Sequence, residues 1–110
     1  MKVYNLSNMT KGWFIGDFDD SVLKTKAFEC AVKHYKQGDK EDSHYHKVAT
    51  EYTVVSCGIV SFNGIQYYQG DIVEVEPNES ISFEAITDAT TFVIKIPSII
   101  GDKYAKTDCA

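Results

Sequence analysis

The chain has 110 residues and a mass of 12.3 kDa, enough for one domain with one hydrophobic core but too little for two. All eleven basic residues are lysine, and sixteen acidic residues bring the formal net charge to -5. This balance argues against a nucleic-acid partner, because proteins bind phosphate backbones through clusters of Lys and Arg and read bases largely through Arg. A hydrophobic content of 44% is sufficient for a folded core and argues against intrinsic disorder.

The cysteines and the N-terminus indicate the cellular compartment. The three cysteines are odd in number and show no C-x-x-C spacing, which favours a reducing compartment over a disulfide framework. The first residues lack the apolar run of a signal peptide, and no segment is long and apolar enough to cross a bilayer. We therefore expect a soluble cytoplasmic protein without a membrane partner, its cysteines buried apart from Cys109 in the tail.

The predicted elements near the N-terminus are short. Residues 13–18 form an alternating apolar segment, and a helical turn is expected over 19–24, with Asp19 or Asp20 as its cap. Residues 28–35 predict a strand, in which alternate side chains share a face. One face of this strand consists of Phe28, Cys30, Val32 and His34.

From residue 51 onward, strand-length segments rich in β-branched and aromatic residues follow one another: EYTVVSC, IVSFNGIQYY, DIVEVEP, SISFEAI and TTFVIKI. Asn63-Gly64 supplies the two positions of positive φ that a two-residue hairpin turn requires. Short strands at close spacing predict a single all-β domain over residues 1–110, built as a sandwich or a barrel.

One cluster of side chains is able to bind a metal ion. His44 and His46 alternate in an extended segment, so both imidazoles project to the same face. Glu51 follows after four intervening residues and reaches the same point if the chain turns between them. Two imidazoles and one carboxylate are the ligands of many iron, manganese and zinc sites. Without Glu51 and the framing Gly38 and Gly58, a pair of exposed loop histidines would be the plainer interpretation; with them, we expect the three side chains to converge on one point.

The same residues carry a resemblance to a known family. The first motif of the cupin superfamily consists of Gly, five residues, His-x-His, four residues, Glu, six residues and Gly. Residues 38–58 resemble this motif and match every fixed position. Gly70-Asp71, followed by a strand and Pro77, resembles the start of the second cupin motif. The resemblance implies an antiparallel jelly-roll β-barrel over about residues 28–96, with an N-terminal strand segment over 1–27 and a C-terminal tail over 97–110. Residues 101–110 of this tail show no core pattern, so we expect them to be surface-bound or frayed.

The second motif departs from the family in one position. Its usual histidine aligns with Ile81, and no histidine follows His46 anywhere in the chain. His34 is a candidate replacement if its face of the predicted strand lines the barrel. The resemblance then implies a divalent ion, Fe, Mn, Zn or Ni, on His44, His46 and Glu51. The predicted ligand pocket consists of Tyr35, Val55, Cys57, Ile81 and Phe83.

Three functions remain open at this stage. The first is a metal-dependent barrel that binds a small polar metabolite and serves as an isomerase, lyase or oxygenase. The second, suggested by the resemblance of His44-Tyr45-His46-Lys47 to sugar-nucleotide ketoisomerase cupins, is a metal-independent isomerase in which a histidine moves a proton; the absence of Arg opposes a diphosphate ligand. The third is a non-catalytic ligand-binding barrel with a vestigial site. Because a small barrel must cover its edge strands, we also expect a homodimer.

Overall fold

The computed structural model describes residues 1–106, which form strands and two short 3₁₀ turns. The turns are η1 (Leu6–Asn8) and η2 (Thr10–Gly12). The strands are β1 (Trp13–Gly16), β2 (Leu23–Lys24), β3 (Glu29–Tyr35), β4 (Lys40–Tyr45), β5 (Thr50–Cys57), β6 (Val60–Phe62), β7 (Ile65–Tyr67), β8 (Ile72–Val75), β9 (Ile81–Ala85), β10 (Ala89–Ile96) and β11 (Tyr104–Ala105). In this part of the chain no helix is long and apolar enough to span a membrane.

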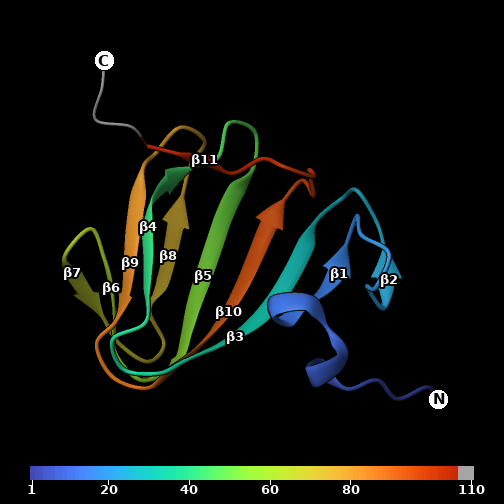
Figure 1. Cartoon of the computed structure of the whole chain (residues 1–110), viewed down its shortest axis with the longest axis horizontal. Helices are drawn as coiled ribbons and strands as arrows, with labels where there is room; N and C mark the ends of the chain where they lie inside the picture. Colours follow the sequence, from blue (N-terminus) through green and yellow to red (C-terminus); the bar gives the residue numbers. More distant parts are fainter. Residues whose placement is uncertain (107–110) are drawn as a thin grey trace.

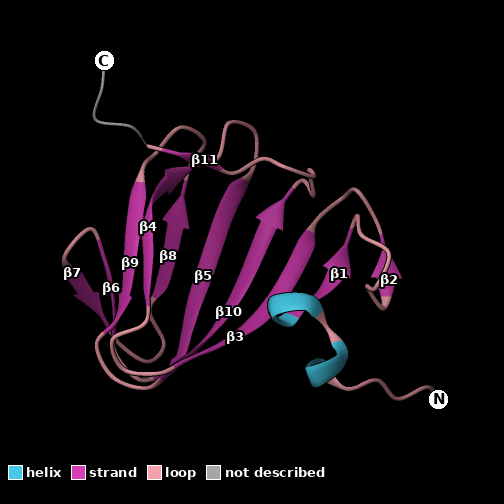
Figure 2. Cartoon of the chain, in the orientation of Figure 1, coloured by secondary structure: helices cyan, strands magenta, loops and turns pink. Residues whose placement is uncertain are grey.

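The strands form two facing sheets (Figures 1 and 2). The larger has the order β2-β1-β3-β10-β5-β8 and the smaller β11-β4-β9-β6-β7. All neighbours are antiparallel except β1 and β2. The predicted all-β, jelly-roll architecture is therefore confirmed, and both sheets extend beyond the expected barrel because β1, β2 and β11 join them.

The apolar core occupies one end of the space between the sheets. The side chains of the central strand β10 that point between the sheets run from the small apolar Ala89 through Thr91 and Val93 to the charged Lys95. The core consists of Val55, Val60, Phe62, Val75, Ile81, Phe83, Ala85 and Ala89. The other end of the barrel is polar and holds the candidate site.

The predicted hairpin at Asn63-Gly64 is confirmed. The two residues connect β6 to β7 with φ values of 53° and 80°, and Phe62 pairs with Ile65 across the turn. The Asn63 side chain also accepts the backbone N–H of Ser82 at 2.8 Å, which ties the turn to β9.

The predicted helical turn over 19–24 is wrong. The chain instead loops back so that Ile15 pairs with Leu23 in the parallel β1-β2 pair, which requires an extended backbone at the end of the loop. The proposed caps have other partners: Asp19 lies 2.9 Å from the Lys24 ammonium, and Asp20 accepts the Thr10 hydroxyl. The helical turns lie earlier, at η1 and η2.

The C-terminal tail, expected to be surface-bound or frayed, is bound along the barrel in its described part. Residues 97–106, here called the C-terminal strap, run along the open end of the barrel from β10 to β11 (Figure 1). Ser98 and Asp102 are buried, and Tyr104 pairs and stacks with Tyr45 of β4. Cys109 lies outside the described residues.

Candidate functional site

A cavity of about 250 Å³ lies between the sheets at the polar end of the barrel. Its charged lining consists of four lysines and three glutamates: Lys11, Lys33, Lys95, Lys103, Glu29, Glu41 and Glu51. The remaining lining consists of Trp13, Tyr35, His44, Thr53, Phe62, Ile81, Phe83, Thr91 and Val93. If all seven charged groups are ionised, the cavity carries one excess positive charge.

Strand register places Lys95 between two glutamates. Lys95 of β10 pairs with Glu29 of β3 on one side and with Glu51 of β5 on the other. Side chains opposite one another in an antiparallel sheet share a face, so the three groups form one row across the cavity wall. Burial raises the pKa of Glu51 and of Glu29, and the positive charge of Lys95 partly opposes both shifts.

A β-bulge in β4 brings two polar side chains into the cavity. Glu41 pairs with Phe83 and His44 pairs with Ile81, so three steps along β4 correspond to two along β9. Without the extra residue, Glu41 and His44 would point to opposite faces. The pairing also places Ile81 directly beside His44, where the resemblance predicted the position of the missing second-motif histidine.

The protonation pattern of His44 follows from its hydrogen bond. Its Nδ1 lies 2.9 Å from the backbone oxygen of Asp42, which only accepts hydrogen bonds, so Nδ1 carries the proton. In the neutral ring Nε2 is then unprotonated. His44 is 6% exposed and lines the cavity, and therefore offers a lone pair able to accept a proton.

His46 is held as a neutral side chain. It is 2% exposed, and its Nε2 has no hydrogen-bond partner within residues 1–106. Burial, reinforced by the positive charge of Lys95, lowers the pKa of His46 to about 4. The His44 and His46 rings have centroids 5.5 Å apart and are nearly perpendicular, at 83°.

The buried, neutral His46 predicts a pH dependence of stability. Because the unfolded chain binds a proton near pH 6.5 and the folded chain only near pH 4, stability should fall as the pH decreases from 6.5 to 4. The lowered pKa of His46 corresponds to a loss of roughly 3 kcal/mol in the free energy of unfolding at the acidic end of this pH interval.

Chemical denaturation of the protein and of His46→Gln at several pH values measures this effect. We expect the difference between their unfolding free energies to shrink over that interval. A difference that does not change with pH would contradict the assignment.

The residues present do not fit the predicted metal site. Nowhere in residues 1–106 do three or more His, Cys, Asp or Glu side chains come together as metal ligands. Ile81 has no donor atom beside His44, and the ammonium groups of Lys33, Lys95 and Lys103 line the same cavity and repel a divalent cation. The Nε2 of His46, which has no hydrogen-bond partner within residues 1–106, is a feature that favours a metal ion.

The condition under which His34 was a candidate ligand, that its face of the strand lines the barrel, is not met. The inward face of β3 carries Lys33 and Tyr35, which line the cavity, whereas His34 is exposed. Its Nδ1 lies 3.0 Å from the Thr90 hydroxyl on the outer surface. Periodicity established which residues of β3 share a face but not which face the second sheet covers.

The predicted pocket residues divide into three groups. Tyr35, Ile81 and Phe83 line the cavity, and Val55 is completely buried in the apolar core. Cys57 is exposed, so its placement in the pocket and its predicted burial are both wrong. The reason is a bulge in β5: Val55 pairs with Thr91 but Cys57 pairs with Thr90, which turns Cys57 to the outer face.

The lysines of the cavity were not predicted as site residues. Within residues 1–106, ion pairs within 4.0 Å join Lys24 with Asp19 and Lys40 with Glu84, and none involves a cavity lysine. Burial lowers the pKa of Lys33, and the nearby ammonium groups of Lys95 and Lys103 lower it further against an opposing effect of Glu41. In a strand, residues two apart share a face, so the apolar Ala31 and Val93 could have identified Lys33 and Lys95 as inward-facing. Lys103 reaches the cavity only because the strap folds over it.

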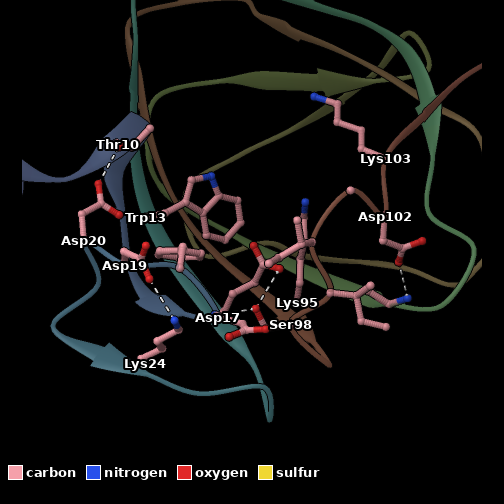
Figure 3. Close-up of a pocket in the computed structure, with 16 residues that line it drawn as sticks. Thr10, Trp13, Asp17, Asp19, Asp20, Lys24, Lys95, Ser98, Asp102 and Lys103 are labelled. Carbon is pink, nitrogen blue, oxygen red and sulfur yellow. Dashed lines mark hydrogen bonds and ion pairs between the residues drawn. The ribbon is translucent and has the colours of Figure 1, made fainter.

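Asp102 fastens the strap to the segment between His46 and Glu51. Its carboxylate accepts the backbone N–H groups of Lys47, Val48 and Ala49 at 2.8, 3.2 and 2.9 Å. Burial by itself would raise the pKa of Asp102, but these three donors together hold it below its usual value. The contact holds the segment that precedes Glu51, and Lys103, the next residue of the strap, lines the cavity. Figure 3 shows Asp102 with one of these hydrogen bonds, and Lys103 beside it in the chain.

Comparison with known structures agrees with this architecture. No protein-family model matches the sequence, and no curated protein matches it at a significant level. A protein with a double-stranded β-helix domain from Klebsiella pneumoniae has a TM-score of 0.68 at 22% identity, over 78% of this chain and 76% of that one. An RmlC-like cupin protein from Ralstonia eutropha has a TM-score of 0.58 at 14% identity, over 66% of this chain and 49% of that one. The chain has the cupin fold.

Another similar structure holds a metal ion. The bacterial pirin YhhW from Escherichia coli, determined in complex with nickel(II), has a TM-score of 0.66 at 15% identity, over 80% of this chain and 39% of that one. Cupin barrels of this shape therefore include a nickel-binding protein. In the present chain, the residue paired with His44 is Ile81, and Lys95 lies on the opposite wall.

Proposed function

We propose that this cupin barrel binds a small organic anion in its cavity. The supporting observation is that Lys33, Lys95 and Lys103 line one cavity and, within residues 1–106, have no carboxylate within 4.0 Å. A carboxylate ligand would accept charge-assisted hydrogen bonds from these ammonium groups, which are stronger than hydrogen bonds between neutral groups. Such a ligand would also neutralise the excess positive charge of the cavity.

The same cavity can move a proton on a bound ligand. The unprotonated Nε2 of His44 is a candidate general base for a proton next to the carbonyl or carboxylate group of the ligand. Burial raises the pKa of Tyr35, so its phenol stays protonated and remains a hydrogen-bond donor. The chemistry that these groups support is a metal-independent proton transfer, as in an isomerase or epimerase.

Metal binding is the second candidate, favoured by the unpartnered His46 Nε2. Within residues 1–106 the side chains of His44, His46 and Glu51 do not converge as a set of metal ligands, and the neighbouring lysines oppose a divalent ion. The two candidates therefore differ in the charge of the species that binds.

Isothermal titration calorimetry of metal-free protein distinguishes anion binding from metal binding. With acetate, malonate and inorganic phosphate as probes, we expect binding with a Kd of about 1 mM or tighter, equivalent to roughly 4 kcal/mol. Added sodium chloride should weaken the binding because it screens the lysines. Equilibrium dialysis against zinc, nickel, manganese and iron(II) should leave less than one ion per chain.

One ion per chain that is lost in His44→Ala, together with no anion binding, would overturn the proposal in favour of a metal centre. If neither an anion nor a metal ion binds, the proposal is also overturned, in favour of a barrel that binds neither class of ligand.

A further inference from the structure

A second pocket of about 540 Å³ opens beside the barrel cavity. It lies between the N-terminal segment, which contributes Trp13 and Asp17, and the C-terminal strap (Figure 3). Four side chains line both spaces: Trp13, Glu29, Lys95 and Lys103. We call the second space the outer pocket; it continues outward from the cavity at the lysines that the proposed anion would contact.

Most acidic groups of the outer pocket already have partners. Asp19 pairs with Lys24, Asp20 accepts the Thr10 hydroxyl, and Asp102 accepts the three backbone N–H groups of the strap contact. These three paired carboxylates form part of the wall of the outer pocket.

Two carboxylates differ from the others. Within residues 1–106 the Asp17 side chain accepts no hydrogen bond and lies within 4.0 Å of no lysine. Glu29 accepts a long bond from the buried Ser98 hydroxyl at 3.3 Å and a backbone hydrogen bond from Ile99. The Ser98 hydroxyl in turn accepts the Asp17 backbone N–H at 2.9 Å. Two carboxylates with spare acceptor capacity thus lie in the same pocket as Lys95 and Lys103, which only donate.

Trp13 forms the boundary between the two spaces. Its ring lies 4.9 Å from the Lys33 ammonium and 5.0 Å from that of Lys95, within the range of cation–π attraction. Figure 3 draws the indole among the side chains that line the pocket, as it does Asp17 and Lys95. The ring offers a flat apolar surface among charged groups.

A hydroxyl group fits this mixed surface because it donates to a carboxylate and accepts from an ammonium group at the same time. An aliphatic chain would leave both kinds of group without a partner, which is costly when water is displaced. The outer pocket therefore suits the polyhydroxylated part of a ligand better than an apolar part.

We propose that the outer pocket and the barrel cavity form one site for a polyhydroxy carboxylic acid, of the aldonic or uronic acid class. Its carboxylate lies among Lys33, Lys95 and Lys103, and its hydroxyl groups lie against Trp13 and the Asp17 and Glu29 carboxylates. This assignment rests on the proposed function, because the cavity lysines provide the anion end of the site.

Three probes of similar length test the assignment by isothermal titration. D-gluconate carries the acid and the hydroxyl groups, hexanoate the acid alone, and D-glucitol the hydroxyl groups alone. We expect gluconate to bind about tenfold or more tightly than hexanoate, the gain of two modest hydrogen bonds. Glucitol should bind more weakly than either acid.

The variant Asp17→Asn tests the outer pocket itself. It should reduce gluconate affinity towards that of hexanoate and leave hexanoate binding unchanged. Glu76→Gln removes the same charge from an exposed residue that lines neither space and serves as the matched control.

The possible failures are distinguishable. Equal affinity for gluconate and hexanoate, or no effect of Asp17→Asn, would overturn the inference while anion binding is retained. If neither acid binds, the proposed function fails and the inference fails with it.

Discussion

The variant Lys95→Met is expected to lose most of the binding of a small carboxylate. Lys95 pairs across the sheet with both Glu29 and Glu51 and lines both the cavity and the outer pocket, so its ammonium group is central to the proposed site. A hydrogen bond to a charged partner contributes about 2 kcal/mol, which predicts a loss of affinity of ~30-fold. Isothermal titration with malonate measures this loss directly.

Two further variants make the result interpretable. Lys36→Met removes the same charge from an exposed residue outside the site and should bind malonate normally. Lys95→Met leaves Glu29 and Glu51 without their neighbouring cation and can destabilise the fold, so Lys103→Met on the strap provides a second test. Unchanged affinity in both Lys95→Met and Lys103→Met would exclude the lysines as the anion site.

The variant Asp102→Ala should cause a large loss of stability. Removal of the carboxylate leaves the N–H groups of Lys47, Val48 and Ala49 without their acceptor, and the last of these is buried. The buried N–H of Ala49 costs about 1–3 kcal/mol when it is left unsatisfied, whereas Lys47 and Val48 are exposed residues whose N–H groups water can reach, so we expect a loss of ~2 kcal/mol. For a domain of this size the melting temperature should fall by roughly 10 °C.

The charge of Asp102 adds a pH dependence that can be checked separately. The folded state holds the pKa of Asp102 below its unfolded value, so its contribution is complete above about pH 4 and is lost as the pH falls further. Thermal melts of Asp102→Asn, which keeps one acceptor oxygen, should show a smaller loss and lack this acid dependence.

Asp88→Ala is the matched control, because Asp88 is exposed and its carboxylate accepts only the backbone N–H of Gln37 among residues 1–106. Equal destabilisation by Asp102→Ala and Asp88→Ala would contradict the assigned role of the strap contact.

Local sequence signals were sufficient where a feature depends on neighbouring residues. Asn63-Gly64 specified its hairpin because few residues adopt positive φ at both positions. Alternation of apolar residues identified the strands, and the spacing from Gly38 to Gly58 identified the fold. The metal interpretation of the same motif is not supported by the geometry, since the side chain that faces His44 is Ile81.

Predictions failed where orientation depended on distant strands. Bulges in β4 and β5 change which side chains face inward, so Glu41 enters the cavity and Cys57 leaves it. A bulge is set by pairing across the sheet and has no clear signal in the bulged strand itself. The homodimer and the cytoplasmic location stay predictions.

By itself, the sequence determined that this is one acidic all-β domain whose basic residues are all lysine, because composition and alternation are local properties. Only the tertiary structure decided what those lysines do. Lys33, Lys95 and Lys103 come from three distant segments, and β-sheet register together with the strap contact of Asp102 brings them to one cavity. The lack of arginine that argues against nucleic acid is thus compatible with a site for a small anion. Three ammonium groups that line one cavity, without a carboxylate within 4.0 Å in residues 1–106, can attract an anion without the bidentate geometry of arginine.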